Sequence, residues 1–200
     1  VAPPRRRDAD HDDQSGVLNA DAYRDIAADR IRAVQQAGGE AKMTMVKVNN
    51  LDEANLNLSE EGQSKLLSAI GDVMNAQSLG GDSAGRIGDE HFSFVHSGDI
   101  DSSEVERQIE AAAKDLVPEG VVITSDTETI EANPEGLSDD QIAKAITYTM
   151  RRFSENKGVG DATLSGQFQV MMKETMESVE AFRKICLTRD FDLHFMPICN

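Results

Sequence analysis

Hydrophobic residues in the first half of the chain follow two periods. After Asn19 they recur every three or four residues, as on one face of a helix, and Gly38-Gly39 ends this pattern. Over 43–48 they alternate with polar residues, which is typical of a half-buried strand. The elements predicted for this half are a helix from residue 19, a strand over 43–48, a helix over 60–76 and a hairpin with strands at 84–87 and 92–96.

The second half of the chain again alternates helical and strand-like patterns. The apolar run over 121–124 predicts a buried strand, and Ser138 is a good N-cap for the helix that follows. The predicted elements are a helix over 103–116, a strand over 121–124 and a helix over 139–154. Strands separated by helices favour an α/β or α+β fold, in which helices pack on a central sheet.

The two ends of the chain differ from this middle part. Residues 1–13 are charged and contain prolines, so they are predicted to be a disordered lead-in or the end of a linker. Small residues around 157–166 predict a domain boundary. The run at 191–198 alternates like a strand and then stops without a partner, which suggests truncation inside a second domain. Between them lies a helical stripe of Phe168, Met171, Met172, Met176, Val179, Phe182 and Cys186.

Charge and composition exclude several classes of function. The formal net charge of -16 repels phosphate backbones, so no nucleic-acid partner is expected. No apolar run is long enough to span a bilayer, so no membrane partner is expected either. The only cysteines, Cys186 and Cys199, form neither a disulfide framework nor a zinc-ligand pattern, which favours a reducing cytoplasm.

Two motifs resemble the GGDEF domain of diguanylate cyclases, enzymes that join two GTP molecules into cyclic di-GMP. The family's opening pattern D-x-L-T-G-L-x-N-R-x-x-F is matched by Asp12, Ser15, Gly16, Val17, Asn19 and Tyr23. The signature hairpin R-hydrophobic-G-G-D/E-E-F is matched, with two departures, by Arg86, Ile87, Gly88, Asp89, Glu90, His91 and Phe92. The resemblance implies a nucleotidyl-cyclase-like fold over residues 14–158, with a central, mostly antiparallel sheet wrapped by helices, and then a connecting helix over 159–190.

A third motif lies at the end of the chain. The run Phe191-x-Leu193-x-Phe195-Met196-Pro197-Ile198 resembles the F-x-L-x-Y-Q-P-I strand that opens EAL domains, which hydrolyse or bind cyclic di-GMP. The resemblance implies that residues 191–200 begin a truncated EAL domain. It also implies that this downstream domain of the same chain is the main partner.

Active members of the GGDEF family hold Mg²⁺ between a carboxylate at a strand end and a carboxylate of the hairpin. Aligning Asn55 with the asparagine of the family's D-x-D-x-F-K-x-x-N-D segment places Lys47 at the strand carboxylate, while Glu90 keeps the hairpin carboxylate. Opposite unit charges about 4 Å apart interact by about 4 kcal/mol at an intermediate dielectric. Reversing one sign therefore weakens metal binding strongly, and the resemblance implies a degenerate metal site.

The positions that contact nucleotide in the family are partly lost. Asn55 keeps one guanine-reading side chain, but Ser64 replaces the second, a carboxylate that accepts two hydrogen bonds. Gly88 is kept, but Asp89 replaces the glycine that lets the hairpin backbone approach the phosphates. The family's inhibitory R-x-x-D motif aligns with Leu79 and Asp82 at its two ends, so its arginine is replaced by leucine. The bidentate hydrogen bonds that this arginine makes to guanine or phosphate are therefore lost.

These departures favour a catalytically inactive GGDEF domain that acts as a regulatory or interaction module of a GGDEF-EAL protein. A GTP-sensing domain that activates the downstream EAL phosphodiesterase and a residual diguanylate cyclase are the alternatives. No cofactor is required, weak binding of Mg²⁺ and GTP is compatible with the retained residues, and a homodimer stays open. The simplest interpretation of Lys47, Asp89, Glu90 and His91 is that they are ordinary surface residues at a strand end and a hairpin tip.

Overall fold

The structure is a computed structural model that describes residues 10–134, 136–159 and 162–188. It divides into two compact units, Val1–Phe168 and Gln169–Asn200, which are described separately. The elements are α1 (Ala20–Gln36), β1 (Ala41–Asn49), α2 (Leu51–Leu56), α3 (Glu60–Gln77), the short 3-10 turn η1 (Leu79–Gly81), β2 (Ala84–Arg86), β3 (His91–Ser97), α4 (Ser102–Ala113), β4 (Thr124–Glu131), α5 (Asp139–Ser154) and α6 (Leu164–Thr188).

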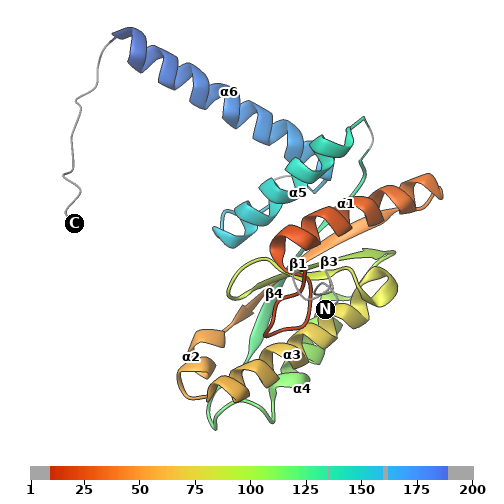
Figure 1. Ribbon diagram of the computed structural model, residues 1–200, viewed down its shortest axis with the longest axis vertical. Coiled ribbons are helices and arrows are strands. Elements are labelled where there is room, and N and C mark those ends of the chain that lie inside the picture. The colour runs from red at the N-terminus through yellow and green to blue at the C-terminus, as the bar shows by residue number, and fades with distance from the viewer. Residues whose placement is uncertain (1–9, 135, 160–161, 189–200) are drawn as a thin grey trace, which may run out of the picture. The chain divides into compact units, whose positions relative to one another are not determined.

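The first unit contains a four-stranded sheet in the order β2-β3-β1-β4. All three strand pairings are antiparallel, and β1 pairs along its length with β3 on one side and β4 on the other. Helices α1 and α5 cover one face of the sheet, and α3 and α4 cover the other (Figure 1). The prediction of a mostly antiparallel sheet wrapped by helices is therefore confirmed.

The alternating pattern of β1 explains why both faces of the sheet are covered. Met43 and Met45 are fully buried in a cluster with residues of α1 and α5, whereas Val46 and Val48 are fully buried in a second cluster with residues of α3 and α4. Successive strand residues point to opposite faces, so a strand with buried apolar residues on both faces needs a helical layer on each side. Lys47 and Asn49 interrupt this pattern on the α1/α5 face, where β1 ends.

Two glycines allow the N-terminal segment and α1 to pack closely on the rest of the domain. A Cβ atom on Gly85 of β2 would lie 2.4 Å from Cβ of Tyr23 in α1, and one on Gly71 of α3 would lie 2.2 Å from the carbonyl oxygen of Ser15. Tyr23 is fully buried, and its hydroxyl lies 2.6 Å from Oγ of Ser93. The first helix is thus locked against the β2–β3 hairpin.

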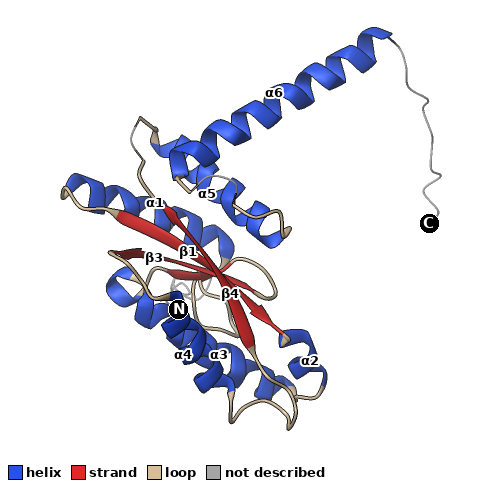
Figure 2. Cartoon of the chain, turned by 180° about the vertical axis from the view of Figure 1, so that it is seen from behind, coloured by secondary structure: helices blue, strands red, loops and turns tan. Residues whose placement is uncertain are grey.

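The strand predicted over 121–124 is wrong. The strand is β4, which begins at Thr124 and runs through the polar sequence to Glu131, and Val122 is 54% exposed. The position of this strand is set by its pairing with β1, because Thr124 to Glu131 pair residue by residue with Asn49 to Lys42. The short helix α2 was not predicted, while the other helices and the hairpin lie within a few residues of their predicted positions (Figure 2).

The structure describes part of each predicted end of the domain. The described residues 10–13 of the predicted lead-in join the fold, since His11 forms a bridge with Leu18. The helix predicted beyond the small-residue cluster is present as α6, and Ser138 caps α5 in a full capping box. The strand-like run at 191–198 lies outside the described residues. No helix among the described residues is both long and apolar enough to cross a membrane.

Candidate functional site

The signature hairpin is fixed to the turn that precedes α1. Leu18 accepts a backbone hydrogen bond from Arg86 and donates one to Ala84, with N···O distances of 2.8 and 3.0 Å. The Arg86 guanidinium donates to carboxylate Oδ1 of Asp12 at 3.2 Å, to Oε1 of Gln14 at 2.9 Å and to the carbonyl of Asp89 at 3.0 Å. The two segments that carry the GGDEF resemblance thus form one structural unit.

Asp12 organises the turn at the start of this unit. Its Oδ1 accepts hydrogen bonds from the backbone amide of Ser15 at 2.8 Å and from the Ser15 hydroxyl at 2.6 Å. Partial burial alone would raise the pKa of Asp12, but the Ser15 hydrogen bonds and the charge of Arg86 outweigh burial and lower it. The first aspartate of the opening motif therefore supports the hairpin structurally and stays ionised.

Lys47, His91 and Asp126 occupy one row across three strands. Lys47 on β1 lies opposite His91 on β3 and opposite Asp126 on β4. Directly paired residues share a face of the sheet. Asn49 Nδ2 donates to Oδ2 of Asp126 at 2.9 Å, which holds this carboxylate beside the end of β1. The position that resembles a metal carboxylate is therefore occupied by an ammonium group with an imidazole and a carboxylate as neighbours.

The segment at and after the end of α5 covers this row. Lys47 Nζ donates to Oδ1 of Asn156 at 3.2 Å, and the ring of Phe153 packs edge-on against His91 with centroids 5.5 Å apart. Asn156 has a left-handed φ of 54°, a conformation that asparagine adopts more readily than most residues. The backbone amide of Val159 donates to Oε2 of Glu128 on β4 at 3.0 Å. The chain after α5 is thus tied to the sheet beside Lys47.

His91 replaces the second acidic residue of the signature and has an unusual environment. Burial lowers its pKa, and the positive charge of Lys47 lowers it further, while Asp89 acts in the opposite direction. Its Nε2 atom is buried and has no hydrogen-bond partner among the described residues. At neutral pH the ring is therefore an uncharged group at a position where the family carries an anion.

The two predicted guanine-reading positions lie on adjacent helices. Asn55 is near the end of α2 and Ser64 is in the second turn of α3. Gln63 Nε2 donates to the carbonyl of Asn55 at 2.9 Å and to that of Leu58 at 3.2 Å, which ties the end of α2 to α3. The Oδ1 atom of Asn55 is buried and has no hydrogen-bond partner among the described residues. A buried acceptor of this kind is costly unless a ligand or water donates to it.

The positions of the predicted lost inhibitory motif, Leu79 and Asp82, lie at the short turn before β2. Leu79 and Asp82 flank two glycines with left-handed φ angles, Gly80 at 78° and Gly81 at 74°. Asp82 is paired nevertheless, because Nη2 of Arg30 on α1 lies 2.8 and 2.7 Å from its two carboxylate oxygens. The partner of Asp82 comes from 52 residues earlier in the chain, so the R-x-x-D spacing cannot reveal it.

The donor set at the hairpin does not fit a magnesium ion. Mg²⁺ prefers oxygen ligands and carboxylates, but the strand position carries the Lys47 ammonium, which is bound to Asn156. Among the residues that the structure describes, no group of three His, Cys, Asp or Glu side chains is placed to hold a metal. Glu90 is half-buried, and its carbonyl accepts the Val48 amide at 2.8 Å.

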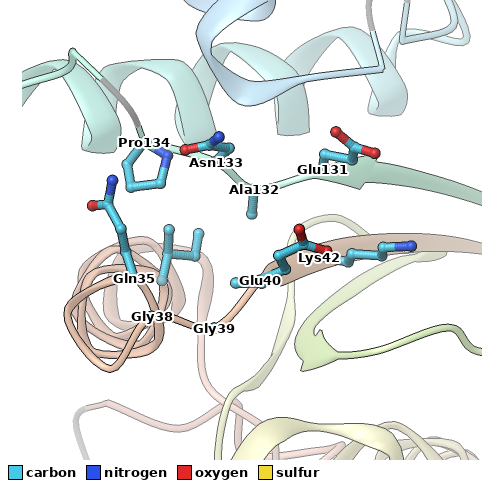
Figure 3. Close-up of a pocket in the computed structure, with 11 residues that line it drawn as sticks. Gln35, Gly38, Gly39, Glu40, Lys42, Glu131, Ala132, Asn133 and Pro134 are labelled. Atoms are coloured by element: carbon cyan, nitrogen blue, oxygen red, sulfur yellow. The ribbon is translucent and has the colours of Figure 1, made fainter.

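A hollow of about 350 Å³ lies at the other end of β1, where α1 turns into the sheet. Figure 3 shows Gly38 and Gly39 on one side of it and Asn133 and Pro134 on the other. A second hollow of about 360 Å³ lies between the end of α4 and the chain before β4. Neither is lined by residues of the signature hairpin, so the geometry of these hollows does not identify the predicted nucleotide site.

Comparisons with known proteins place the fold. No family model matches the chain, and no curated protein matches it. The GGDEF domain of DgcB from Caulobacter crescentus in complex with c-di-GMP has 16% identity and a TM-score of 0.53, covering 80% of this chain and 98% of its own. A microbial GGDEF domain studied for its interaction with bis-(3′,5′)-cyclic di-GMP has 16% identity and a TM-score of 0.54, covering 76% and 95%.

The GGDEF domain of the Pseudomonas aeruginosa protein TpbB, or YfiN, has 13% identity and a TM-score of 0.50, and the match covers 82% of this chain and 99% of that one. Likenesses at this level of identity establish the fold. The chain therefore has a GGDEF-type, nucleotidyl-cyclase-like fold, as its motifs predicted.

Proposed function

We propose that this chain is a GGDEF-type module of cyclic di-GMP signalling that does not make cyclic di-GMP from GTP. The observation that carries the proposal is Lys47, which lies opposite His91 and binds Asn156 at the strand end where the family places a metal carboxylate. Phosphoryl transfer in this family depends on a dication that neutralises the triphosphate. A cation in place of the strand carboxylate opposes the binding of that dication.

The signalling assignment is supported by the fold and by its neighbours. One of the similar structures is a complex with c-di-GMP, and another describes the interaction of a GGDEF domain with cyclic di-GMP. The EAL-like motif at 191–198 supports a connection to a downstream domain that degrades or binds the same dinucleotide. In this proposal the domain transmits a signal to that partner or sets its arrangement.

The absence of synthesis is tested by incubating the chain with GTP and either Mg²⁺ or Mn²⁺ and separating the products by chromatography. We expect no cyclic di-GMP above the amount formed by a Glu90→Ala variant prepared in the same way. That variant removes the retained hairpin carboxylate, so it reports any contaminating cyclase. Turnover by the original chain that the variant lacks would show that the site is active.

The regulatory role is tested in a longer protein that contains the EAL domain implied by the motif. Deleting residues 14–158 should change the rate at which that protein hydrolyses cyclic di-GMP. An unchanged rate, with the EAL domain shown to be folded, would remove the regulatory role and leave the absence of synthesis untouched.

A second candidate function is GTP binding without turnover, and one observation favours it. The buried Oδ1 of Asn55 lacks a donor among the described residues, and a guanine edge carries N–H donors that can satisfy it. Calorimetry with GTP, ATP and an Asn55→Ala variant tests this function. We expect binding of GTP that is stronger than that of ATP and is weakened by Asn55→Ala; equal affinities for both nucleotides would contradict it.

A further inference from the structure

The hollow of about 350 Å³ at the start of β1 has a size that is typical of small-molecule sites. Its lining includes buried apolar residues, since Ile31 and Ala132 are fully buried and Ala41 is 8% exposed. The backbone amide of Ala132 donates to the carbonyl of Ala41 at 2.9 Å, which holds together the two strand ends that line the hollow. The hollow is therefore built from fixed parts of the fold.

Two carboxylates also line this hollow. Glu131 at the end of β4 lies opposite Lys42 on β1, and Glu40 directly precedes β1. Both glutamates are exposed, and neither forms an ion pair within the part of the chain that the structure describes. A carboxylate without an ion pair is a good acceptor for an ammonium group, which forms short, charge-assisted hydrogen bonds.

Lys42 is the only cation among the described residues that line the hollow. Its ammonium group donates to Oδ1 of Asp99, which is not part of the lining. Figure 3 shows its side chain extending along β1, away from the two glycines that follow α1. The pKa of Lys42 is raised, mainly by the hydrogen bond with Asp99 and also by the charges of Glu131 and Glu40. Because Asp99 already neutralises Lys42, the two glutamates give the hollow a negative potential.

The end of α1 adds to this potential. Gly38 and Gly39 donate backbone hydrogen bonds to the carbonyls of Gln35 and Val34, both at 2.9 Å, which ends the helix beside the hollow. A helix carries a partial negative charge at its C-terminus, and a basic residue in the last turn offsets it in many proteins. The last turn of α1 contains no basic residue. The helix end therefore favours a cation at this place.

The chemistry of the lining distinguishes among classes of ligand. Phosphates and other anions are repelled by the two glutamates. A bound metal ion is not favoured, since the described residues include no group of three His, Cys, Asp or Glu side chains that is placed to hold one. An aliphatic amine matches both parts of the lining, because its methylene groups pack on apolar surface while its ammonium group meets a carboxylate.

We propose that the hollow at the start of β1 binds a small aliphatic diamine, with its methylene groups against the buried apolar residues and its ammonium groups at Glu40 and Glu131. The inference goes beyond the proposed function and does not depend on it, because no residue of the signature hairpin lines the hollow.

The test is a titration of the whole chain with putrescine, a four-carbon diamine, followed by the NMR methyl signals of Ile31, Ala41 and Ala132. We expect these signals to shift and to saturate, with a dissociation constant of about a millimolar or lower for so small a ligand. The four-carbon diol of the same length has no charge and should bind at least about tenfold more weakly.

The variants Glu131→Gln and Glu40→Gln remove the charges and keep the side-chain shapes. Each should weaken putrescine binding at least about threefold, and the double variant at least about tenfold. The matched control is Glu119→Gln, which removes an equal charge from an exposed residue before the start of β4, at the opposite end of the β1–β4 pair. It should leave the dissociation constant within about twofold of the original.

Three results would overturn the proposal. The first is a titration in which the methyl signals of the hollow do not shift and saturate. The second is equal affinity for putrescine and the diol, which would show that the carboxylates do not select the ligand. The third is equal weakening by Glu119→Gln and Glu131→Gln, which would show that putrescine is attracted to the acidic surface in general. Unchanged methyl signals elsewhere in the domain verify that each variant is folded.

Discussion

Lys47 and His91 face each other across the β1–β3 ladder, and the charge of the lysine adds to burial in lowering the pKa of the imidazole. The GGDEF resemblance assigns carboxylates to both positions. Since the two residues are cross-strand partners, the two departures from the motif change one place in the fold. The row that contains the Lys47 cation and the neutral His91 ring also contains the Asp126 carboxylate.

The first prediction concerns the role of Lys47 in nucleotide binding. Its ammonium group can neutralise phosphate oxygens directly, as lysines do in other phosphate sites. We expect GTP to bind with an affinity no better than tens of micromolar, on the order of -6 to -7 kcal/mol, and with little dependence on Mg²⁺. Lys47→Asp should make binding depend on Mg²⁺, which titration calorimetry with Mg²⁺ and with a chelator measures.

The matched control for this change is Lys65→Asp. Lys65 is an exposed lysine of α3 that pairs with Glu61, so this variant alters the total charge equally at a distance from the hairpin. It should leave the Mg²⁺ dependence unchanged. Tight binding by the original chain that requires Mg²⁺ would show that Lys47 does not act as the substitute charge.

The second prediction is that cyclic di-GMP does not bind at Leu79 and Asp82. Leu79 offers no donor, and both carboxylate oxygens of Asp82 are engaged by Arg30. Calorimetry with cyclic di-GMP should detect no micromolar binding that depends on this place. Micromolar binding that Asp82→Ala abolishes would contradict the prediction, and Arg30→Ala would then show whether the arginine of α1 takes over the role of the missing one.

Much of the fold could be predicted because its main elements have strong local signals. The periodic apolar faces of α1, α3 and α5 and the alternation in β1 are properties of neighbouring residues. Strand β4 lacks such a signal, since its sequence Thr-Ser-Asp-Thr-Glu-Thr-Ile-Glu is mostly polar and only its pairing with β1 makes it a strand. Tertiary pairing decided its position, and the more apolar residues before it became loop.

The site could be predicted only as far as its motifs are continuous in sequence. The hairpin residues and Lys47 were placed from local patterns, whereas Asp126, Asn156 and Arg30 were missed. Each of these three meets its partner only through the fold, across separations of 52 residues or more. The structure therefore adds the surroundings that determine how the predicted residues behave.

The third prediction concerns the close contact between α1 and β2. Gly85→Ala should destabilise the domain by about 1–3 kcal/mol, because its Cβ would lie 2.4 Å from Cβ and 2.5 Å from Cγ of the fully buried Tyr23. Urea denaturation measures the loss. Gly39→Ala is the milder comparison, since its new atom would lie 3.1 Å from Cγ1 and 3.4 Å from the carbonyl oxygen of Val34, both longer than the contacts at Gly85. Equal losses in the two variants would show that the α1–β2 contact is not tightly packed.

The last prediction concerns stability below neutral pH. His96 is 3% exposed, and its Nδ1 lies 3.2 Å from the carbonyl of Gly98, an acceptor to which the ring must donate. In the neutral ring Nε2 then accepts from the hydroxyl of Thr44 at 2.8 Å, and that oxygen lies 2.7 Å from the hydroxyl of Thr129. This network accommodates the uncharged imidazole.

Burial is the main cause of the lowered pKa of His96, and the charge of Lys42 adds to it, while the hydrogen bond with Gly98 and the charge of Asp99 act in the opposite direction. Below the ordinary value of 6.5 the unfolded chain binds a proton that the folded chain does not, so the free energy of unfolding falls as pH falls from 6.5 towards the lowered pKa.

Urea denaturation of the His96→Gln variant should give a smaller decline over this range, and the lowered pKa of His91 accounts for part of the decline that remains. Above about pH 7, where both histidines are neutral in both states, the variant should differ by a constant offset and not in slope. Equal slopes for the original chain and the variant between pH 6.5 and 5 would show that His96 takes up its proton as readily in the folded chain as in the unfolded one.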